Sequence, residues 1–145
     1  MPVDYILEMI EELGRAMRAI IARKKDQPAK ALDEIRMAFN GTKFGNKAFF
    51  DGLSPEELAV FVREQKVDYR AADYIVDILL EEADINRDLE LERLAMGGAE
   101  QQPDPSHLLL LSKIQVLIDY TAAVETSLKI FSLKRNQQRE RLRSF

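Results

Sequence analysis

The sequence predicts an all-α fold of six to seven antiparallel helices. Apolar residues recur at steps of three and four along most of the chain, which is the spacing of one helix face. No run of four or more residues alternates apolar and polar side chains between turn signals, so we expect no strand. A chain of 145 residues can bury a core without disulfides, which predicts a single helical domain over residues 1–145.

The first two helices are bounded by residues that start and stop helices. Asp4 is a candidate N-cap, and Pro28 both closes the first helix and suits the first turn of the second. Asn40-Gly41 is a strong stop signal for the second helix. The apolar stripe of the first helix consists of Ile6, Met9, Ile10, Leu13, Met17, Ile20 and Ile21.

The segment 41–53 is predicted to be a loop, because it contains three glycines. We expect its apolar side chains to hold it against the core; they are Phe44, Phe49, Phe50 and Leu53. The third helix then begins at a capping box, in which Ser54 caps and Glu57 reaches back to the Ser54 amide. It should end near Gln65.

Asp68 is predicted to cap the next helix, whose outward stripe is formed by Asp73, Asp77, Glu81 and Asp84. Periodicity does not decide whether residues 84–88 form a turn or continue the helix. Residues 97–105 predict a flexible loop, and from Ser106 the chain is compatible with helix, with a turn or kink near 119–121. The tail 135–145 has no apolar face and is expected to fray.

A weak internal period favours stacked helical hairpins. The predicted helix starts at Asp68 and Asp104-Pro105 lie about 37 residues apart, which is close to the tetratricopeptide unit of 34 residues. Each start would be followed by a break and a second helix, with Tyr120 at the turn and Ala123 at a close crossing. Leu111 stands where the repeat usually has glycine, so a closed helical bundle is the alternative.

Three motifs resemble a family of small bacterial all-helical proteins without an assigned function. They are Asp4-Tyr5-Ile6 with Met9-Ile10 and Leu13-Gly14, then Ala31-Leu32 with Ile35, then Leu53-Ser54-Pro55-Glu56 with Leu58. These are mainly core and cap residues. The resemblance implies a helical fold and a bacterial source, and it carries over no active-site residue.

The composition excludes several kinds of chemistry. The chain has no cysteine, which removes disulfides, thiolate zinc sites and cysteine nucleophiles. His107 is the only histidine, so there is no His pair for a metal, and any histidine relay would have to use this single ring. No Gly-x-Ser-x-Gly nucleophile motif is present. No glycine-rich phosphate loop is present. We therefore expect a protein that is not an enzyme and needs no cofactor or metal.

Charge is segregated along the chain. Residues 68–104 contain eleven acids and three bases, whereas residues 129–145 contain six bases and one acid. The basic tail suits a helix end, and it could also pair with phosphate or with the acidic segment of another subunit. The stretch 108–133 is apolar on more than one side, so it is either central in the monomer or covered in a homodimer.

Two hypotheses for function follow. The first is a protein-interaction module built from helical hairpins, which binds an unidentified protein or peptide through Asp73, Asp77, Gln115 and Asp119. The second is a nucleic-acid-associated accessory protein that acts through Arg135, Arg139 and Arg141, although a net charge of −4 makes nucleic acid the less favoured partner.

The location is predicted to be cytoplasmic. The first residues lack the basic start and apolar stretch of a secretory signal. The apolar stretch 108–118 is interrupted by polar residues and is shorter than the roughly 20 residues that span a bilayer, so no membrane contact is expected.

Overall fold

The structure is a computed structural model that describes residues 3–98 and 105–145. Within these ranges it is all-α and contains no strand, as the periodicity predicts. Its elements are α1 (Val3–Arg23), α2 (Pro28–Ala38), the short 3₁₀ helix η1 (Phe39–Gly41), α3 (Lys47–Gly52), α4 (Pro55–Glu64), α5 (Tyr69–Ala95), α6 (Pro105–Ser127) and α7 (Leu133–Arg143). Asp104 and most of the predicted loop 97–105 lie outside the described residues, as does the side chain of Asp4.

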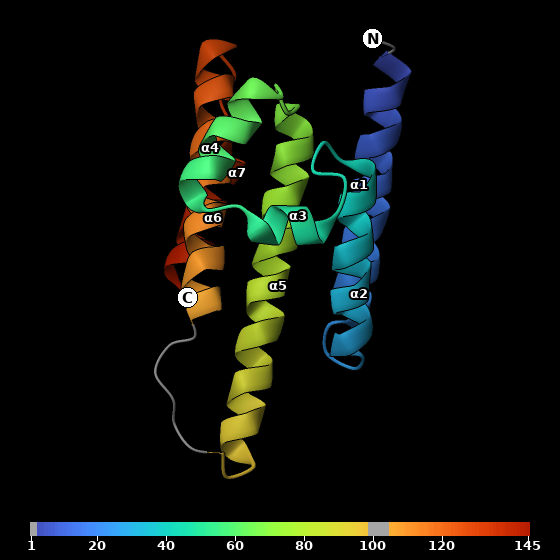
Figure 1. Cartoon of the computed structure of the whole chain (residues 1–145), viewed down its shortest axis with the longest axis vertical. Helices are drawn as coiled ribbons and strands as arrows, with labels where there is room; N and C mark the ends of the chain where they lie inside the picture. Colours follow the sequence, from blue (N-terminus) through green and yellow to red (C-terminus); the bar gives the residue numbers. More distant parts are fainter. Residues whose placement is uncertain (1–2, 99–104) are drawn as a thin grey trace.

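Helix α5 runs through the middle of the molecule, with α1 and α2 on one side and α6 and α7 on the other (Figure 1). The pairs α1–α2 and α5–α6 are antiparallel hairpins, and α4 packs against α6. Because α5 contacts helices on both sides, it is buried over much of its length, from Ala71 to Ile85. Its hydrophobic residues therefore join both halves into one core.

Several helix boundaries agree with the residues that predict them. Ser54 and Glu57 form the capping box of α4, with Ser54 Oγ accepting from the Glu57 amide at 3.0 Å. Asp68 caps α5 by accepting from the Arg70 amide at 2.9 Å, and Pro28 opens α2. These signals act within one helical turn, which explains why the sequence alone reveals them.

The predicted loop 41–53 is wrong in part, since residues 47–52 form α3. Asn46 caps this helix by accepting from the Phe49 amide at 2.7 Å. Phe44 and Phe50 are buried, with ring centroids 5.2 Å apart in an edge-on arrangement, so the expectation that these rings hold the segment is confirmed. Phe49, in contrast, is 43% exposed.

The breaks that a tetratricopeptide-like repeat requires are absent from both long helices. Helix α5 continues through residues 84–88, and α6 continues through the expected kink at 119–121. Ala123 is exposed rather than at a close crossing, and the Tyr120 hydroxyl donates to the Val67 carbonyl at 2.6 Å. The repeat-like arrangement is thus not confirmed, although the all-α class is.

The tail is also different from its prediction, because residues 133–143 form the ordered helix α7. Arg135 is 5% exposed and Gln138 is 3% exposed, so the side of α7 that faces the rest of the molecule is mainly polar, with Leu142 packed against the core. An apolar stripe is the usual reason for a helix to dock, and this helix lacks one. Here the contact is made by charge and hydrogen bonds instead.

Among the described residues, α6 is the one helix long and apolar enough to cross a membrane by length and composition. This corrects the expectation that the apolar stretch is too short. Core helices of proteins without a membrane span have the same properties. In this fold α6 lies against α4, α5 and α7, and the side chains it buries in the core include Leu110, Ile114, Leu117 and Ile118.

Candidate polar interface between α5 and α7

Four carboxylates follow one side of α5 and form what we term the acidic face: Asp73, Asp77, Glu81 and Asp84. Their spacing of four, four and three residues places them one above the other along the helix. The sequence predicts that these four side chains point outward. That prediction is wrong, because Asp73 and Asp77 are partly covered by α7 and Glu81 is only 3% exposed.

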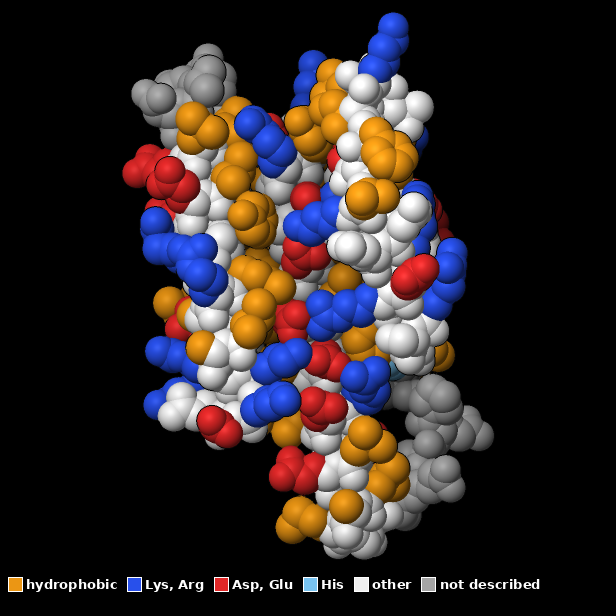
Figure 2. Space-filling model, turned by 180° about the vertical axis from the view of Figure 1, so that it is seen from behind, with side chains coloured by type: hydrophobic (Ala, Val, Ile, Leu, Met, Phe, Trp, Pro, Cys, Tyr) orange, Lys and Arg blue, Asp and Glu red, His pale blue; other side chains and the backbone are white. Residues whose placement is uncertain are grey.

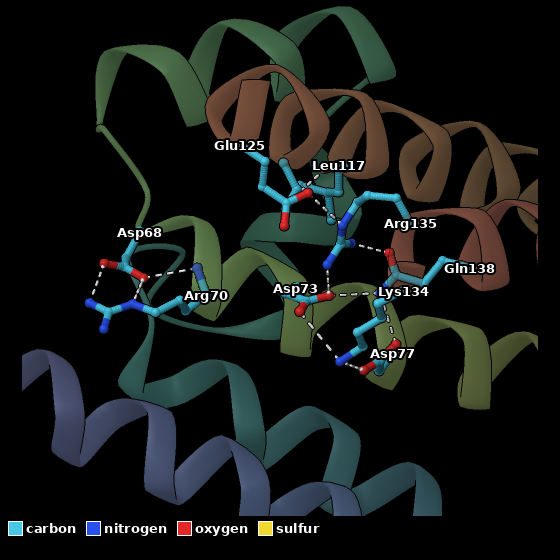
Figure 3. Close-up of polar contacts among 10 residues, drawn as sticks. Asp68, Arg70, Asp73, Asp77, Leu117, Glu125, Lys134, Arg135 and Gln138 are labelled. Carbon is cyan, nitrogen blue, oxygen red and sulfur yellow. Dashed lines mark hydrogen bonds and ion pairs between the residues drawn. The ribbon is translucent and has the colours of Figure 1, made fainter. Parts of the chain in front are cut away.

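The first turns of α7 bind the upper part of the acidic face (Figure 3). The Arg135 Nη2 atom lies 2.5 Å from Asp73 Oδ1, and Arg135 Nε donates to Glu125 of α6 at 2.9 Å. The Gln138 side-chain amide donates to Asp73 at 2.8 Å and to Asp77 at 2.9 Å. One arginine and one glutamine of α7 therefore join α5, and the arginine joins α6 as well.

Lys134 completes this upper group from a more exposed position. Its Nζ atom lies 2.6 Å from Asp77 Oδ2 and 3.3 Å from Asp73 Oδ2. Burial by itself would lower the pKa of Lys134, but the hydrogen bonds and charges of Asp77 and Asp73 outweigh it, and the pKa is raised. The ammonium group thus stays charged at neutral pH and neutralises two carboxylates.

The lower part of the acidic face pairs with cations from α7 and from the turn after α1. Arg141 of α7 places Nη2 2.8 Å from Glu81 Oε2. Lys24, in the turn after α1, donates to Glu81 at 2.7 Å and to Asp84 at 2.6 Å. Arg87 also pairs with Asp84. Figure 2, seen from behind, shows acidic and basic side chains alternating down the middle of this face.

This interface is suited to holding a helix in register. A buried ion pair gains little free energy over apolar packing of the same volume, because both charges lose their water, but unpaired alternatives are strongly disfavoured. Such contacts specify which residue lies opposite which. Among the described residues, no group of three acids or histidines is arranged to hold a metal ion.

The structure brings together four of the residues that the sequence singles out: Asp73, Asp77, Arg135 and Arg141. It does not bring Gln115 and Asp119 to them. These two lie on the exposed side of α6, where Gln115 Nε2 donates to Asp119 at 2.9 Å. Arg139 is half-buried on α7 and is absent from the contacts described above.

Sequence reasoning missed Lys24, Glu125, Lys134 and Gln138 as members of this site. One signal was available for the α7 members. Lys134, Gln138 and Arg141 repeat at four and three residues, which matches the spacing of the acidic face. Lys24 and Glu125 offer no such signal, since only the packing of α1 and α6 brings them close.

A second polar cluster lies where α3 ends against α6. Lys113 is 2% exposed, and its Nζ donates to the carbonyls of Phe50 at 2.7 Å and Asp51 at 3.0 Å. It also lies 4.8 Å from the centroid of the Phe50 ring. Burial lowers the pKa of Lys113, with partial compensation by the charge of Asp51. Lys113 thereby satisfies the last carbonyls of α3.

An open groove of about 1290 Å³ lies beside this cluster, between the C-terminal half of α5 and the start of α6. Its lining includes Glu82, Arg87, His107 and Lys113, so charges of both signs face it. The edge of the His107 ring packs 6.2 Å from the Phe145 ring, measured between centroids. The groove thus favours neither acidic nor basic ligands.

Comparison with protein-family models, curated proteins and solved structures found no match to this chain. The resemblance to the small bacterial helical proteins is untested for that reason, and the fold and the interface carry the functional argument.

Proposed function

We propose that this protein is a non-catalytic protein-interaction module whose acidic face on α5 binds a basic helix. Helix α7 occupies that face in the free chain. The observation that carries the proposal is the docking of α7 through Lys134, Arg135, Gln138 and Arg141 rather than through an apolar stripe. A surface that recognises one helix by charge and spacing can bind another helix with the same pattern of charges.

The exposed ion pairs of α7 are weak, which supports its replacement on the acidic face by another helix. Helix α7 has 11 residues, which is too short to be stable alone in water. Lys134 and Arg141 are 41% and 36% exposed, and exposed ion pairs contribute at most about 1 kcal/mol each. The buried pair of Arg135 sets the register. A competing helix must therefore reproduce the buried contacts of Arg135 and Gln138, while the exposed pairs add little to what it has to displace.

The nucleic-acid hypothesis is the weaker alternative. It relied on the positive charge of the tail, and in this fold Lys134, Arg135 and Arg141 are paired with carboxylates. Those cations would have to leave the acidic face before they could bind phosphate. The expectation of a cytoplasmic protein stays a prediction.

The test uses a labelled peptide with the sequence of residues 133–143 and the full-length chain at low salt. The strap variant carries two substitutions in α7, Lys134→Glu and Gln138→Glu, so that its α7 is repelled by its own acidic face. It should bind the peptide about tenfold more tightly than the wild type, because its own α7 competes less well for the acidic face. The face variant, Asp73→Lys with Asp77→Lys, should not bind it. Fluorescence anisotropy measures both affinities.

Two controls separate recognition from general charge attraction. A peptide of the same composition in scrambled order should bind the strap variant weakly, because the spacing of its cations no longer matches the acidic face. The variant Glu64→Lys with Asp119→Lys changes two exposed acids on α4 and α6 and shifts the net charge as much as the face variant does. It should retain the wild-type affinity. Equal binding of both peptides to the strap variant would reject the proposal.

A further inference from the structure

We infer that the helix which occupies the acidic face in trans is α7 of a second copy of this chain, so that two copies exchange their C-terminal helices. This inference rests on the proposed function and names its partner. It is carried by the hinge between α6 and α7, residues 128–132, which is independent of the ion pairs themselves.

Helix α6 ends in a Schellman turn at the hinge. The residues of this turn are not those that usually favour it. Lys129 donates its amide to Thr126 at 3.1 Å, and Ile130 donates to Glu125 at 2.8 Å. The central residue of this turn, Lys129, has φ +58°, a conformation that costs a non-glycine residue free energy. The chain therefore turns here without the glycine that most such turns use.

Among the described residues, Schellman turns also end α4 and α5, and each has a supporting feature that the hinge lacks. After α5 the same hydrogen bonds form at Gly97, which has φ +88°. After α4 they form at Lys66, and there the flanking Val62 and Val67 are both buried, which supplies the usual apolar contact. At the hinge the corresponding residues are Glu125 and Ile130. Since Glu125 is charged, that apolar contact is not made.

The hinge also exposes large apolar side chains. Leu128, Phe131 and Leu133 are 54%, 83% and 66% exposed, and Ile130 is 40% exposed. In a symmetric exchange of α7 the two hinges approach the twofold axis, where these side chains can cover one another. Extension of α6 through the hinge would also release the positive φ of Lys129. Both effects favour the exchanged dimer over the closed monomer.

The contacts between α7 and α5 are the same in both states, so they do not oppose the exchange. Exchange is opposed by the high effective concentration of α7 at its own acidic face, which favours the closed monomer at low protein concentration. We therefore expect a monomer when dilute and a dimer at high micromolar concentration. The segregation of acids and bases along the chain fits such pairing between subunits as well as pairing within one.

The experiment mixes the face variant with the strap variant. In either variant alone, α7 and the acidic face carry charges that repel. An exchanged heterodimer contains two α7–α5 interfaces. In one, the wild-type α7 of the face variant binds the wild-type acidic face of the strap variant. In the other, the two introduced glutamates of the strap variant lie against the two introduced lysines of the face variant. We expect light scattering to show about twice the chain mass of 16.6 kDa for the mixture, and the chain mass for each variant alone.

A chain carrying all four substitutions is the matched control, because its α7 and acidic face are again complementary. It should behave as the wild type does. Adding Lys129→Gly to this four-substitution chain, which can dock its own α7, should raise its dimer dissociation constant by about tenfold, since glycine removes the cost of the positive φ in the closed turn.

The outcomes separate this inference from the proposed function. If the strap variant binds the 133–143 peptide but the mixture keeps the mass of one chain, the exchange is rejected and the interaction module stands. If neither peptide binding nor a heterodimer is observed, both are rejected. An unchanged dimer dissociation constant in the four-substitution chain after Lys129→Gly would overturn the role given to the hinge.

Discussion

At the scale of the residue, Asp84 shows how one carboxylate can join several segments of the chain. It accepts a hydrogen bond from Lys24 and pairs with Arg87, while Arg141 lies 3.8 Å away. Burial by itself would raise the pKa of Asp84, but Lys24 and the two arginines outweigh it, so the pKa is lowered. Asp84 therefore links α1, α5 and α7 through its negative charge.

This residue should make the stability depend on pH in the acid range. Because the folded pKa of Asp84 is below the unfolded value of 3.8, its contribution is complete above that value and is lost as the pH falls through the folded pKa. At about pH 6 we expect Asp84→Asn to lower the free energy of unfolding by about 1–2 kcal/mol. Urea denaturation at about pH 6 and at an acid pH below 3.8 should show this difference shrinking at the lower pH.

The exposed Asp88 on the same helix provides the control, since Asp88→Asn should change the stability little at either pH. A deficit of the Asp84→Asn variant that is equally large at both pH values would show that shape, not charge, explains its effect.

At the scale of the element, helix ends in this protein are encoded with unequal strength. The capping box of α4 and the Asp68 cap of α5 use side chains that favour these positions. The ends of α4 and α6, in contrast, place lysines at positive φ, at Lys66 and Lys129. Buried valines support the first of these turns, so its remaining cost is conformational.

Lys66→Gly should therefore stabilise the protein. Glycine adopts the φ of +50° without the clash of a Cβ atom, and the gain should be about 0.5–1 kcal/mol after its greater freedom in the unfolded state is subtracted. Thermal or urea unfolding measures it. The control is Lys43→Gly, at an exposed residue without a positive φ, which should not stabilise the protein. A loss of stability in Lys66→Gly would show that the backbone at Lys66 is not strained.

At the scale of the whole molecule, two kinds of packing hold the helices. Helices α1, α2, α4, α5 and α6 share the hydrophobic core, with residues such as Ile20, Ile35, Leu58, Ile75 and Ile114 fully buried. Helix α7 joins them mainly through charge and hydrogen bonds, although Leu142 packs against the core. The free energy that holds α7 should consequently respond to salt, whereas the core should not.

We expect about 1 M sodium chloride to increase hydrogen exchange in α7 by severalfold at low protein concentration, because salt at that level screens the half-exposed pairs of Lys134 and Arg141. Amides of α4, whose Leu58 and Val62 are buried, serve as the internal reference and should exchange at an unchanged rate. Mass spectrometry of peptides from each helix measures this. Equal protection of α7 in low and high salt would show that its docking is not electrostatic.

The fold class could be predicted because its signals are local. Apolar spacing and caps such as Ser54 and Asp68 act within a turn or two, so they identify most helices without knowledge of the fold. The helix at residues 47–52 was missed because its stability comes from Phe50 in the core and from Lys113, which is more than sixty residues away. Helix α7 was missed because it lacks the apolar stripe that sequence analysis relies on.

For the candidate site, the residue types were visible but their partners were not. The sequence determined that acids gather in one segment and bases in another, and that the chain is helical. Only the tertiary structure decided that Asp73 and Asp77 face Arg135 and Gln138 rather than solvent, since residues about sixty positions apart meet only when α5, α6 and α7 pack together. Local preferences come from backbone sterics and caps, whereas pairing of distant charges depends on how whole helices pack.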